Sequence, residues 1–231
     1  MNAPKKMIAG FLWQVGIGPL LRTVRAPEHL AICYHSIADN GQHDHIRIAI
    51  KDFSHHIEYL ASRGYQFVKF SELASTQGRA AVIYFDDGFR DVFTNAKPIL
   101  EQKNIPATLF VTTSYADGAR DPAVYASWDE ITALGSGWEI GSHSVSHRKL
   151  SKLSKEEVRQ EMIESKKIIE EKTGRTVKVF SYPHGRASVD TEVIAHEVGY
   201  MMTTADERFH RVRPDPDDSL AVFYWKALKL W

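Results

Sequence analysis

Residues 80–88 read AAVIYFDDG, an apolar run that ends in two adjacent carboxylates, Asp86 and Asp87. Such a run is typical of a buried strand, so the acids are expected where a strand ends and a loop begins. Neighbouring carboxylates repel each other, and burying them without partners costs roughly several kcal/mol, so the pair is expected to share a cation or a proton. Gly88 fits a tight turn that brings the backbone close to whatever the acids hold.

Residues 141–147 read GSHSVSH and offer further ligands for a cation. His143 and His147 are four residues apart, and they fall on one face if the segment forms a helical turn, which lets both imidazoles reach one metal. Two histidines and one aspartate make three protein ligands and leave the remaining positions to water and substrate. This pattern is typical of a catalytic zinc-type site rather than a structural one.

Each of these patterns also has an ordinary explanation. An Asp-Asp pair after a strand is more often an exposed turn, and a chain with 11 histidines produces some pairs by accident. The chain has such accidental candidates on predicted polar loops and helix surfaces, namely His43, His45, His55 and His56. The acids and the histidine pair differ from these because each follows a predicted strand, which favours one shared site.

Strand and helix patterns alternate along most of the chain. Strands are predicted at 30–34, 67–69, 81–85, 107–111, 138–140, 177–180 and 201–204, and helices at 52–63, 91–103, from 128, 154–173 and 189–198. Ser127 and Ser154 each begin a helix with a capping box. Repeated strand-then-helix order predicts an α/β fold with parallel strands and outer helices, and the number of units suits a barrel. In such a barrel the chemistry collects at the carboxyl ends of the strands.

The motifs resemble those of the polysaccharide deacetylases, carbohydrate esterase family 4. They are FDDG at residues 85–88, GSHSVSH at 141–147 and SYPHG at 181–185, and the likeness extends to CYHSI at 33–37, so that it covers residues 30–213. The layout is most similar to the subgroup that deacetylates poly-N-acetylglucosamine exopolysaccharide, in which a Tyr-His element precedes the Asp-Asp motif. The resemblance implies a distorted, incomplete (β/α) barrel, in agreement with the strand and helix pattern.

This resemblance also implies roles for the site residues. A metal would be held by Asp87, His143 and His147, with zinc as the default and cobalt or nickel as alternatives that fit the same ligands. Asp86 would be the base that takes a proton from the attacking water. The backbone N–H of His184 matches the position of a second oxyanion donor.

The chain departs from the commoner family pattern in its general acid. No element after Tyr200 matches the usual Leu-x-His, so the resembled subgroup points to His35 as the acid instead. Ser181 stands where many members have an arginine that tunes the base, and Arg211 and Arg213 are the candidates to replace that arginine. Tyr182, next to His184, is the candidate for lining a sugar subsite.

Composition limits the partners. Lys plus Arg and Asp plus Glu are both 29, so the net charge is zero and nothing favours a nucleic-acid partner. The single cysteine, Cys33, cannot form an intrachain disulfide and is expected in a core strand. The oligomeric state is left open.

Three segments are expected along the chain: an apolar and basic N-terminal segment 1–28, a catalytic domain 29–213 and an amphipathic C-terminal helix 214–231 packed on it. The apolar run 7–21 is shorter than the roughly twenty residues that span a bilayer and shows no small-x-small cleavage site. It is either a helix packed on the domain or an interfacial anchor, so peripheral membrane contact stays open. A cytoplasmic or membrane-associated location is therefore expected rather than secretion.

The sequence thus predicts a metal-dependent hydrolase that removes N-acetyl groups from amino sugars of a polysaccharide or its precursor. Two alternatives stay open. One alternative is an amide hydrolase that acts on a small molecule, which stays open because the sequence says little about subsite length. The other is a catalytically silent carbohydrate-binding relic. The complete set of two aspartates and two histidines argues against the relic. Specificity is expected in the loops 39–45 and 114–122.

Overall fold

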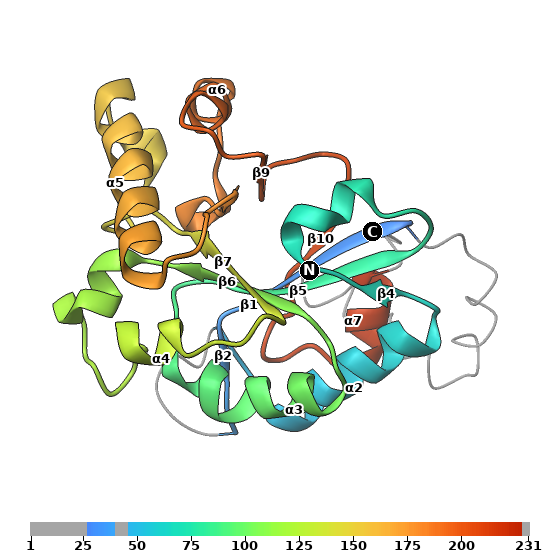
Figure 1. Cartoon of the computed structure of the whole chain (residues 1–231). Coiled ribbons are helices and arrows are strands. Elements are labelled where there is room, and N and C mark those ends of the chain that lie inside the picture. Colours follow the sequence, from blue (N-terminus) through green and yellow to red (C-terminus); the bar gives the residue numbers. More distant parts are fainter. Residues whose placement is uncertain (1–26, 40–45, 228–231) are drawn as a thin grey trace.

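A parallel sheet forms the centre of the computed structural model, which describes residues 27–39 and 46–227. Eight strands of this described part pair in the order β10-β1-β5-β6-β7-β8-β9, with β4 added beside β5. The sheet curls into an open half-barrel with helices around it (Figure 1). The fold class expected from the sequence, a distorted and incomplete (β/α) barrel with parallel strands and outer helices, is confirmed.

The strands of this sheet are short. They are β1 (His29–Tyr34), β4 (Gln66–Phe67), β5 (Ala80–Phe85), β6 (Ala107–Val111), β7 (Trp138–Ser142), β8 (Val179–Phe180), β9 (Met202–Thr203) and β10 (His210–Val212). A separate parallel pair is formed by β2 (Ser36–Ile37) and β3 (Arg47–Ile48). The sequence did not predict β10, which lies parallel to β1 at the edge of the sheet. Its three residues carry no strand pattern of their own, and the pairing with β1 places them.

The helices follow the predicted positions closely. They are α2 (Ile50–Ser62), α3 (Lys97–Gln102), α4 (Trp128–Thr132), α5 (Lys155–Thr173), α6 (Val189–Glu197) and α7 (Leu220–Ala227). The predicted capping boxes are present at Ser127 and Ser154, and α5 ends at Gly174, whose φ of 67° is left-handed. A wide helical turn at Val92–Ala96 precedes α3, so the predicted helix 91–103 changes its winding just before Pro98.

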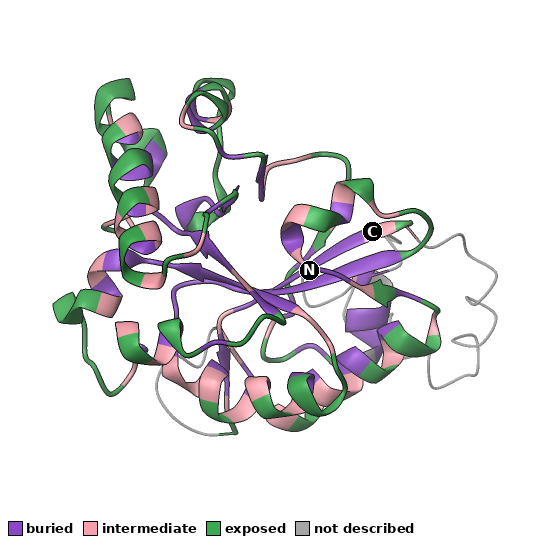
Figure 2. Ribbon diagram, in the orientation of Figure 1, coloured by how far each residue is buried: buried purple, intermediate pink, exposed green. Residues whose placement is uncertain are grey.

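Side chains alternate between two apolar clusters on the two faces of the sheet. Leu30 and Ile32 of β1 pack in the cluster that also takes in the helices, whereas Ala31 and Cys33 pack with Tyr84 in a cluster without residues of α2 to α7. Figure 2 shows the buried strands in the middle and the exposed outer faces of the helices. The second cluster therefore fills the inside of the half-barrel, and the polar site lies at its carboxyl end.

Gly141 in β7 is expected to be intolerant of any side chain. A Cβ built there would lie 2.6 Å from the Phe110 ring and 2.8 Å from Val179 Cγ2. We expect Gly141→Ala to lower the free energy of unfolding by about 2 to 3 kcal/mol, because overpacking a filled core forces neighbouring side chains out of their rotamers. A urea unfolding curve measures this. Gly137→Ala is the matched control, since nothing lies within 4 Å of its added Cβ; equal midpoints for the two variants would contradict the prediction.

Helix α7 covers one face of α2, and this corrects the prediction for His56. The Phe223 ring stacks on His56 with centroids 3.7 Å apart, and Tyr224 stacks on Tyr59 at 3.7 Å. His56 is 2% exposed, and its Nδ1 lies 3.0 Å from the Tyr34 hydroxyl. Burial lowers the pKa of His56 to about 3, so the ring is neutral. The sequence suggested a surface histidine because the helix that covers it comes from the distant C-terminal segment.

Several predictions fall on segments that the structure does not describe. These are residues 1–26 of the N-terminal segment 1–28, residues 40–45 of the 39–45 loop, and residues 228–231 of the C-terminal segment. In the described part of the chain, no helix combines the length and the apolar character needed to cross a bilayer.

Candidate active site

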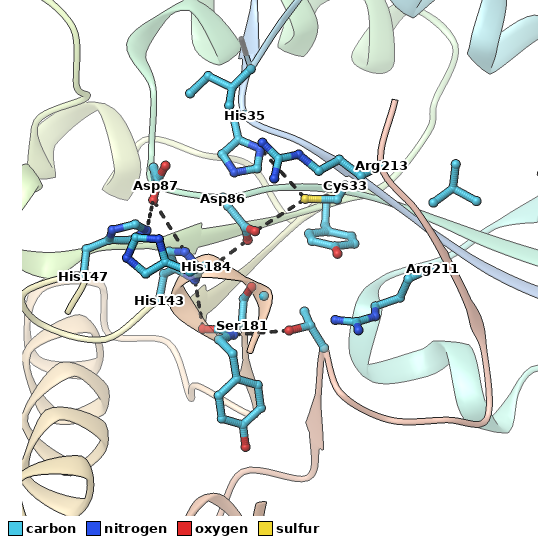
Figure 3. Close-up of a pocket in the computed structure, with 16 residues that line it drawn as sticks. Cys33, His35, Asp86, Asp87, His143, His147, Ser181, His184, Arg211 and Arg213 are labelled. Atoms are coloured by element: carbon cyan, nitrogen blue, oxygen red, sulfur yellow. Dashed lines mark hydrogen bonds and ion pairs between the residues drawn. The ribbon is translucent and has the colours of Figure 1, made fainter. Parts of the chain in front are cut away.

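A cavity of about 580 Å³ lies at the carboxyl ends of the strands. It is lined by residues that follow β1, β5, β7 and β8 and by residues of β10. The seven residues singled out from the sequence all line it: His35, Asp86, Asp87, His143, His147, Tyr182 and His184. Figure 3 shows the aspartate and histidine side chains turned toward a common centre.

Asp87, His143 and His147 form the tightest cluster of this cavity. Asp87 Oδ1 lies 3.1 Å from His147 Nε2 and 3.5 Å from His143 Nε2. Ligand atoms of the three side chains all lie within 4.8 Å of one another. Asp87 Oδ1 is buried without a hydrogen bond of good geometry, although the two ring nitrogens are near. Three donors aimed at one point, one of them an oxygen that lacks a proper partner, fit a divalent cation.

The backbone reaches this arrangement without the helical turn that the histidine spacing suggested. Residues 143–149 are irregular, and Ser144 and His147 have left-handed φ values of 68° and 56°. Asp87 has a φ of 72° and is followed by Gly88 at 83°. Positive φ is uncommon for residues other than glycine and costs on the order of 1 kcal/mol or more, so such positions cluster at functional sites.

His143 is held in one tautomer. Its Nδ1 donates a hydrogen bond to the Ser181 carbonyl oxygen at 2.8 Å, and a carbonyl can only accept. The Nε2 lone pair is then free to face Asp87 and His147, as a ligand histidine requires. Burial lowers the pKa of His143 to about 4, which keeps the ring neutral. Burial alone would raise the pKa of Asp87, but the close approach of His147, whose own pKa is raised, and the electrostatic attraction of the neighbouring histidines hold the pKa of Asp87 well below its usual range.

Glu161 holds the loop between the two histidines, and the sequence analysis missed it. One oxygen accepts from the backbone N–H groups of Val145 and Ser146 at 2.9 and 3.0 Å, and the other from the Ser146 hydroxyl at 2.5 Å. Arg148 donates to the same carboxylate at 3.2 Å. A signal was present in the sequence, because Glu161 interrupts the apolar stripe of α5 next to Met162. In the structure this glutamate is 6% exposed.

Asp86 lies deeper than Asp87 and has different partners. The Cys33 thiol donates to Asp86 Oδ2 at 3.4 Å, and the Ser181 side chain also bonds this carboxylate. Asp86 Oδ1 is buried without a hydrogen-bond partner among the described residues and lies 3.9 Å from His143 Nδ1. Burial, aided by the neighbouring Asp87 charge, raises the pKa of Asp86 to about 6. A carboxylate with such a pKa is a competent base near neutral pH.

The suggested arginine partners of this carboxylate are not bonded to it. In residues 27–39 and 46–227, neither Arg211 nor Arg213 makes an ion pair with Asp86, although both line the cavity. Cys33 and Ser181 orient the carboxylate instead. The sequence suggested arginine because Ser181 replaces one, and it gave no sign that a thiol from β1 fills the space.

His35 and His184 stand at two sides of the cavity. His35 Nδ1 lies 3.9 Å from Cys33 Sγ, and Figure 3 places the ring beside Arg213. Burial lowers the pKa of His35, and the positive charge of Arg213 acts in the same direction. His184 has a left-handed φ of 61°, and its ring centroid lies 4.7 Å from that of His147.

The Tyr182 side chain is not placed to stack on a sugar. It is 1% exposed, and its hydroxyl donates to the Thr191 carbonyl at 3.2 Å. Its ring packs edge-on against Phe180 at 5.1 Å. Tyr182 thus lines the cavity as part of its wall, with its polar tip turned into the protein, and its place in a sugar subsite stays a prediction.

The fold and this cavity define a class of hydrolase, and sequence comparison identifies it. Residues 74–203 match the family profile of the polysaccharide deacetylases, and this match spans more than half of the chain. The chain belongs to the polysaccharide deacetylase family. The resemblance noted in its motifs is thereby confirmed at the level of the family.

Individual relatives agree with this assignment. YxkH of Bacillus subtilis (strain 168), a protein assigned to the polysaccharide deacetylases, is 28% identical over 229 residues, which cover 90% of this chain and 80% of YxkH. The deacetylase PplD of Streptococcus pyogenes, solved with acetate, has a TM-score of 0.75 at 19% identity over 88% of this chain and 99% of its own. IcaB from Ammonifex degensii has a TM-score of 0.73 at 22% identity, and the match covers 87% of this chain and 97% of IcaB. At these identities the two structures establish the shared fold.

Proposed function

We propose that this chain is a metal-dependent hydrolase that removes N-acetyl groups from N-acetylated amino sugars of a polysaccharide or its precursor. The observation that carries the proposal is the cluster of Asp87, His143 and His147 beside Asp86, a separate carboxylate whose pKa is raised to about 6. A cation site and an adjacent base are the two groups that hydrolysis of an unactivated amide needs.

The cation would be held by Asp87 Oδ1 and the two imidazoles. Zinc suits a site of two histidines and one aspartate, and cobalt or nickel fits the same ligands. A divalent cation supplies a Lewis acid beside the amide to be cleaved. Ser181 and Glu161 would keep the two histidines in place, through the His143 ring and the 145–146 backbone.

The remaining steps belong to side chains of the cavity. Asp86 takes a proton from the attacking water, and its Oδ1, which lacks a hydrogen-bond partner in the described part of the chain, is the atom available to receive it. His35 donates a proton to the leaving amine nitrogen; its lowered pKa makes the protonated ring a stronger acid. The backbone N–H of His184 donates a hydrogen bond to the oxyanion that forms when the water attacks the acetyl carbonyl. The Tyr-His likeness in residues 33–37 supports this role of His35 and a place in the poly-N-acetylglucosamine subgroup.

Metal removal tests the proposal. We expect acetate release from short N-acetylglucosamine oligomers to fall at least about 100-fold after chelation, because a Lewis acid contributes several kcal/mol to the transition state. Zinc or cobalt added back should restore the activity. The measurement is acetate release together with the metal content of the protein.

The other outcomes separate the alternatives. A protein that binds metal but releases no acetate from any oligomer would favour an amide hydrolase on a small molecule. A protein that binds no metal would fit the catalytically silent relic and would overturn the site assignment. Undiminished acetate release after complete metal removal would contradict metal dependence.

A further inference from the structure

Two arginines on the wall of the cavity have no part in the proposed reaction. Strand β10 pairs with β1 so that Ala31 is opposite Arg211 and Ile32 is opposite Val212. Because strand residues alternate, the Val212 side chain packs in the core, whereas Arg211 and Arg213, the residue after β10, lie on the other face; all three residues line the cavity. The strand therefore presents two guanidinium groups to the site.

Figure 3 shows where these groups lie. Arg211 and Arg213 are on the side of the pocket away from Asp87 and His147, with Arg213 beside His35 and Arg211 pointing toward Ser181. The cavity of about 580 Å³ extends from one group to the other, since both line it. It falls within the range of ligand sites of roughly 300 to 1,000 Å³. A substrate that places its acetamido group at Asp87 has room to reach the arginines.

Neither arginine is neutralised by the protein in the described ranges. Other basic side chains in the C-terminal part do have acidic partners: Arg208 pairs with Asp206, and Lys226 pairs with Asp215 at 2.9 Å. No ion pair of Arg211 or Arg213 is present among residues 27–39 and 46–227. Both guanidinium groups line one cavity and neither is paired with a carboxylate of the described residues, so their side of the cavity favours an anion.

The charge of the whole cavity leads to the same conclusion. Its carboxylates are Asp86 and Asp87, and its guanidinium groups are Arg211 and Arg213, so the formal charges of the lining cancel. A divalent cation bound as proposed leaves the site with an excess of positive charge. A neutral amino sugar would leave this excess uncompensated, whereas a carboxylate or phosphate group would reduce it.

We infer that Arg211 and Arg213 form an anion subsite, and that the substrate carries a phosphate or carboxylate group on or next to its N-acetylated sugar. The inference rests on the proposed deacetylase function, and it replaces the neutral N-acetylglucosamine polymer of that proposal by a substrate that carries an acidic group. A guanidinium group binds either anion through two parallel hydrogen bonds, so the two groups share one recognition chemistry.

Three small substrates test this with the zinc-loaded full chain: methyl N-acetylglucosaminide, N-acetylglucosamine 1-phosphate and N-acetylmuramic acid. We expect kcat/KM for at least one acidic substrate to exceed that for the neutral one by roughly tenfold or more. A hydrogen bond to a charged group contributes roughly a factor of ten to binding. The phosphate and the carboxylate substrate show which anion is preferred. Arg211→Gln and Arg213→Gln should each reduce the preference by a similar factor, mainly through KM.

Two further variants control the experiment. Arg208→Gln removes a paired arginine of the same segment and should keep the preference. Arg213→Lys keeps the charge but loses the planar fork, so it should retain part of the preference. Equal kcat/KM for neutral and acidic substrates, or a preference unchanged in both Gln variants, would overturn the inference. Inhibition by acetate that is lost in those variants without any substrate preference would assign the arginines to the product instead.

Failure of the proposed function is recognisable separately. If the wild type releases acetate from none of the substrates, titration calorimetry with inorganic phosphate still decides the subsite. Binding to the wild type and to Arg208→Gln that weakens roughly tenfold in Arg211→Gln would support it. Equal binding to all three proteins, or to none, would reject it.

Discussion

Asp86→Asn is expected to reduce acetate release about 1,000-fold or more while leaving zinc binding intact. General base catalysis contributes roughly 10²- to 10⁴-fold, and an amide cannot take the proton of the attacking water. Asparagine keeps the size of the side chain and retains a carbonyl oxygen that can accept from the Cys33 thiol. The loss should therefore appear in kcat with little change in the free energy of unfolding. Steady-state acetate release and the zinc content of the same sample measure both effects.

Asp87→Asn is the informative comparison for this variant. Asp87 Oδ1 lies within 3.5 Å of both histidine Nε2 atoms, so its replacement should reduce zinc affinity as well as activity. Excess zinc should recover part of the activity of Asp87→Asn and none of that of Asp86→Asn. Retention of more than about a tenth of the wild-type kcat in Asp86→Asn would place the base elsewhere, because such a loss is smaller than general base catalysis supplies.

The order of strands and helices could be predicted from the sequence because local patterns determine it. The apolar run of β5, the capping boxes of α4 and α5 and the left-handed Gly174 each act within a few residues. What escaped prediction depends on partners far along the chain. Strand β10 exists through its pairing with β1, and His56 is buried because α7 covers it.

The site divides along the same line. Asp86, Asp87 and the histidine pair were predicted to lie together because they follow strands β5 and β7, and parallel strands bring their carboxyl ends together. The groups that orient them were not identified, since Cys33 and Ser181 reach Asp86 from separate strands. The sequence position of Tyr182 next to His184 likewise does not reveal that its hydroxyl turns to the Thr191 carbonyl.

Glu161→Gln is expected to weaken zinc binding roughly 10- to 100-fold, the usual effect of losing a group that positions a metal ligand. The carboxylate accepts hydrogen bonds from two backbone N–H groups, from Ser146 and from Arg148, which exceeds what one amide can accept. Whichever way the amide turns, its NH₂ group faces donors. The loop that carries His147 should then lose its fixed shape. The free energy of unfolding should fall by roughly 1 to 3 kcal/mol, because buried donors lose their acceptor while the half-exposed Arg148 is solvated.

Competition with a chromophoric chelator measures the zinc affinity, and urea unfolding measures the stability. Glu164→Gln is the matched control because it lies one turn further along α5, is exposed and bonds only Gln160 among the described residues. A positioning role predicts that saturating zinc restores kcat in Glu161→Gln, since Asp86 and His35 are untouched by the change. Zinc affinity equal to that of Glu164→Gln would show that the loop keeps its shape without the carboxylate, and the left-handed Ser144 and His147 would then be sufficient to hold the two histidines together.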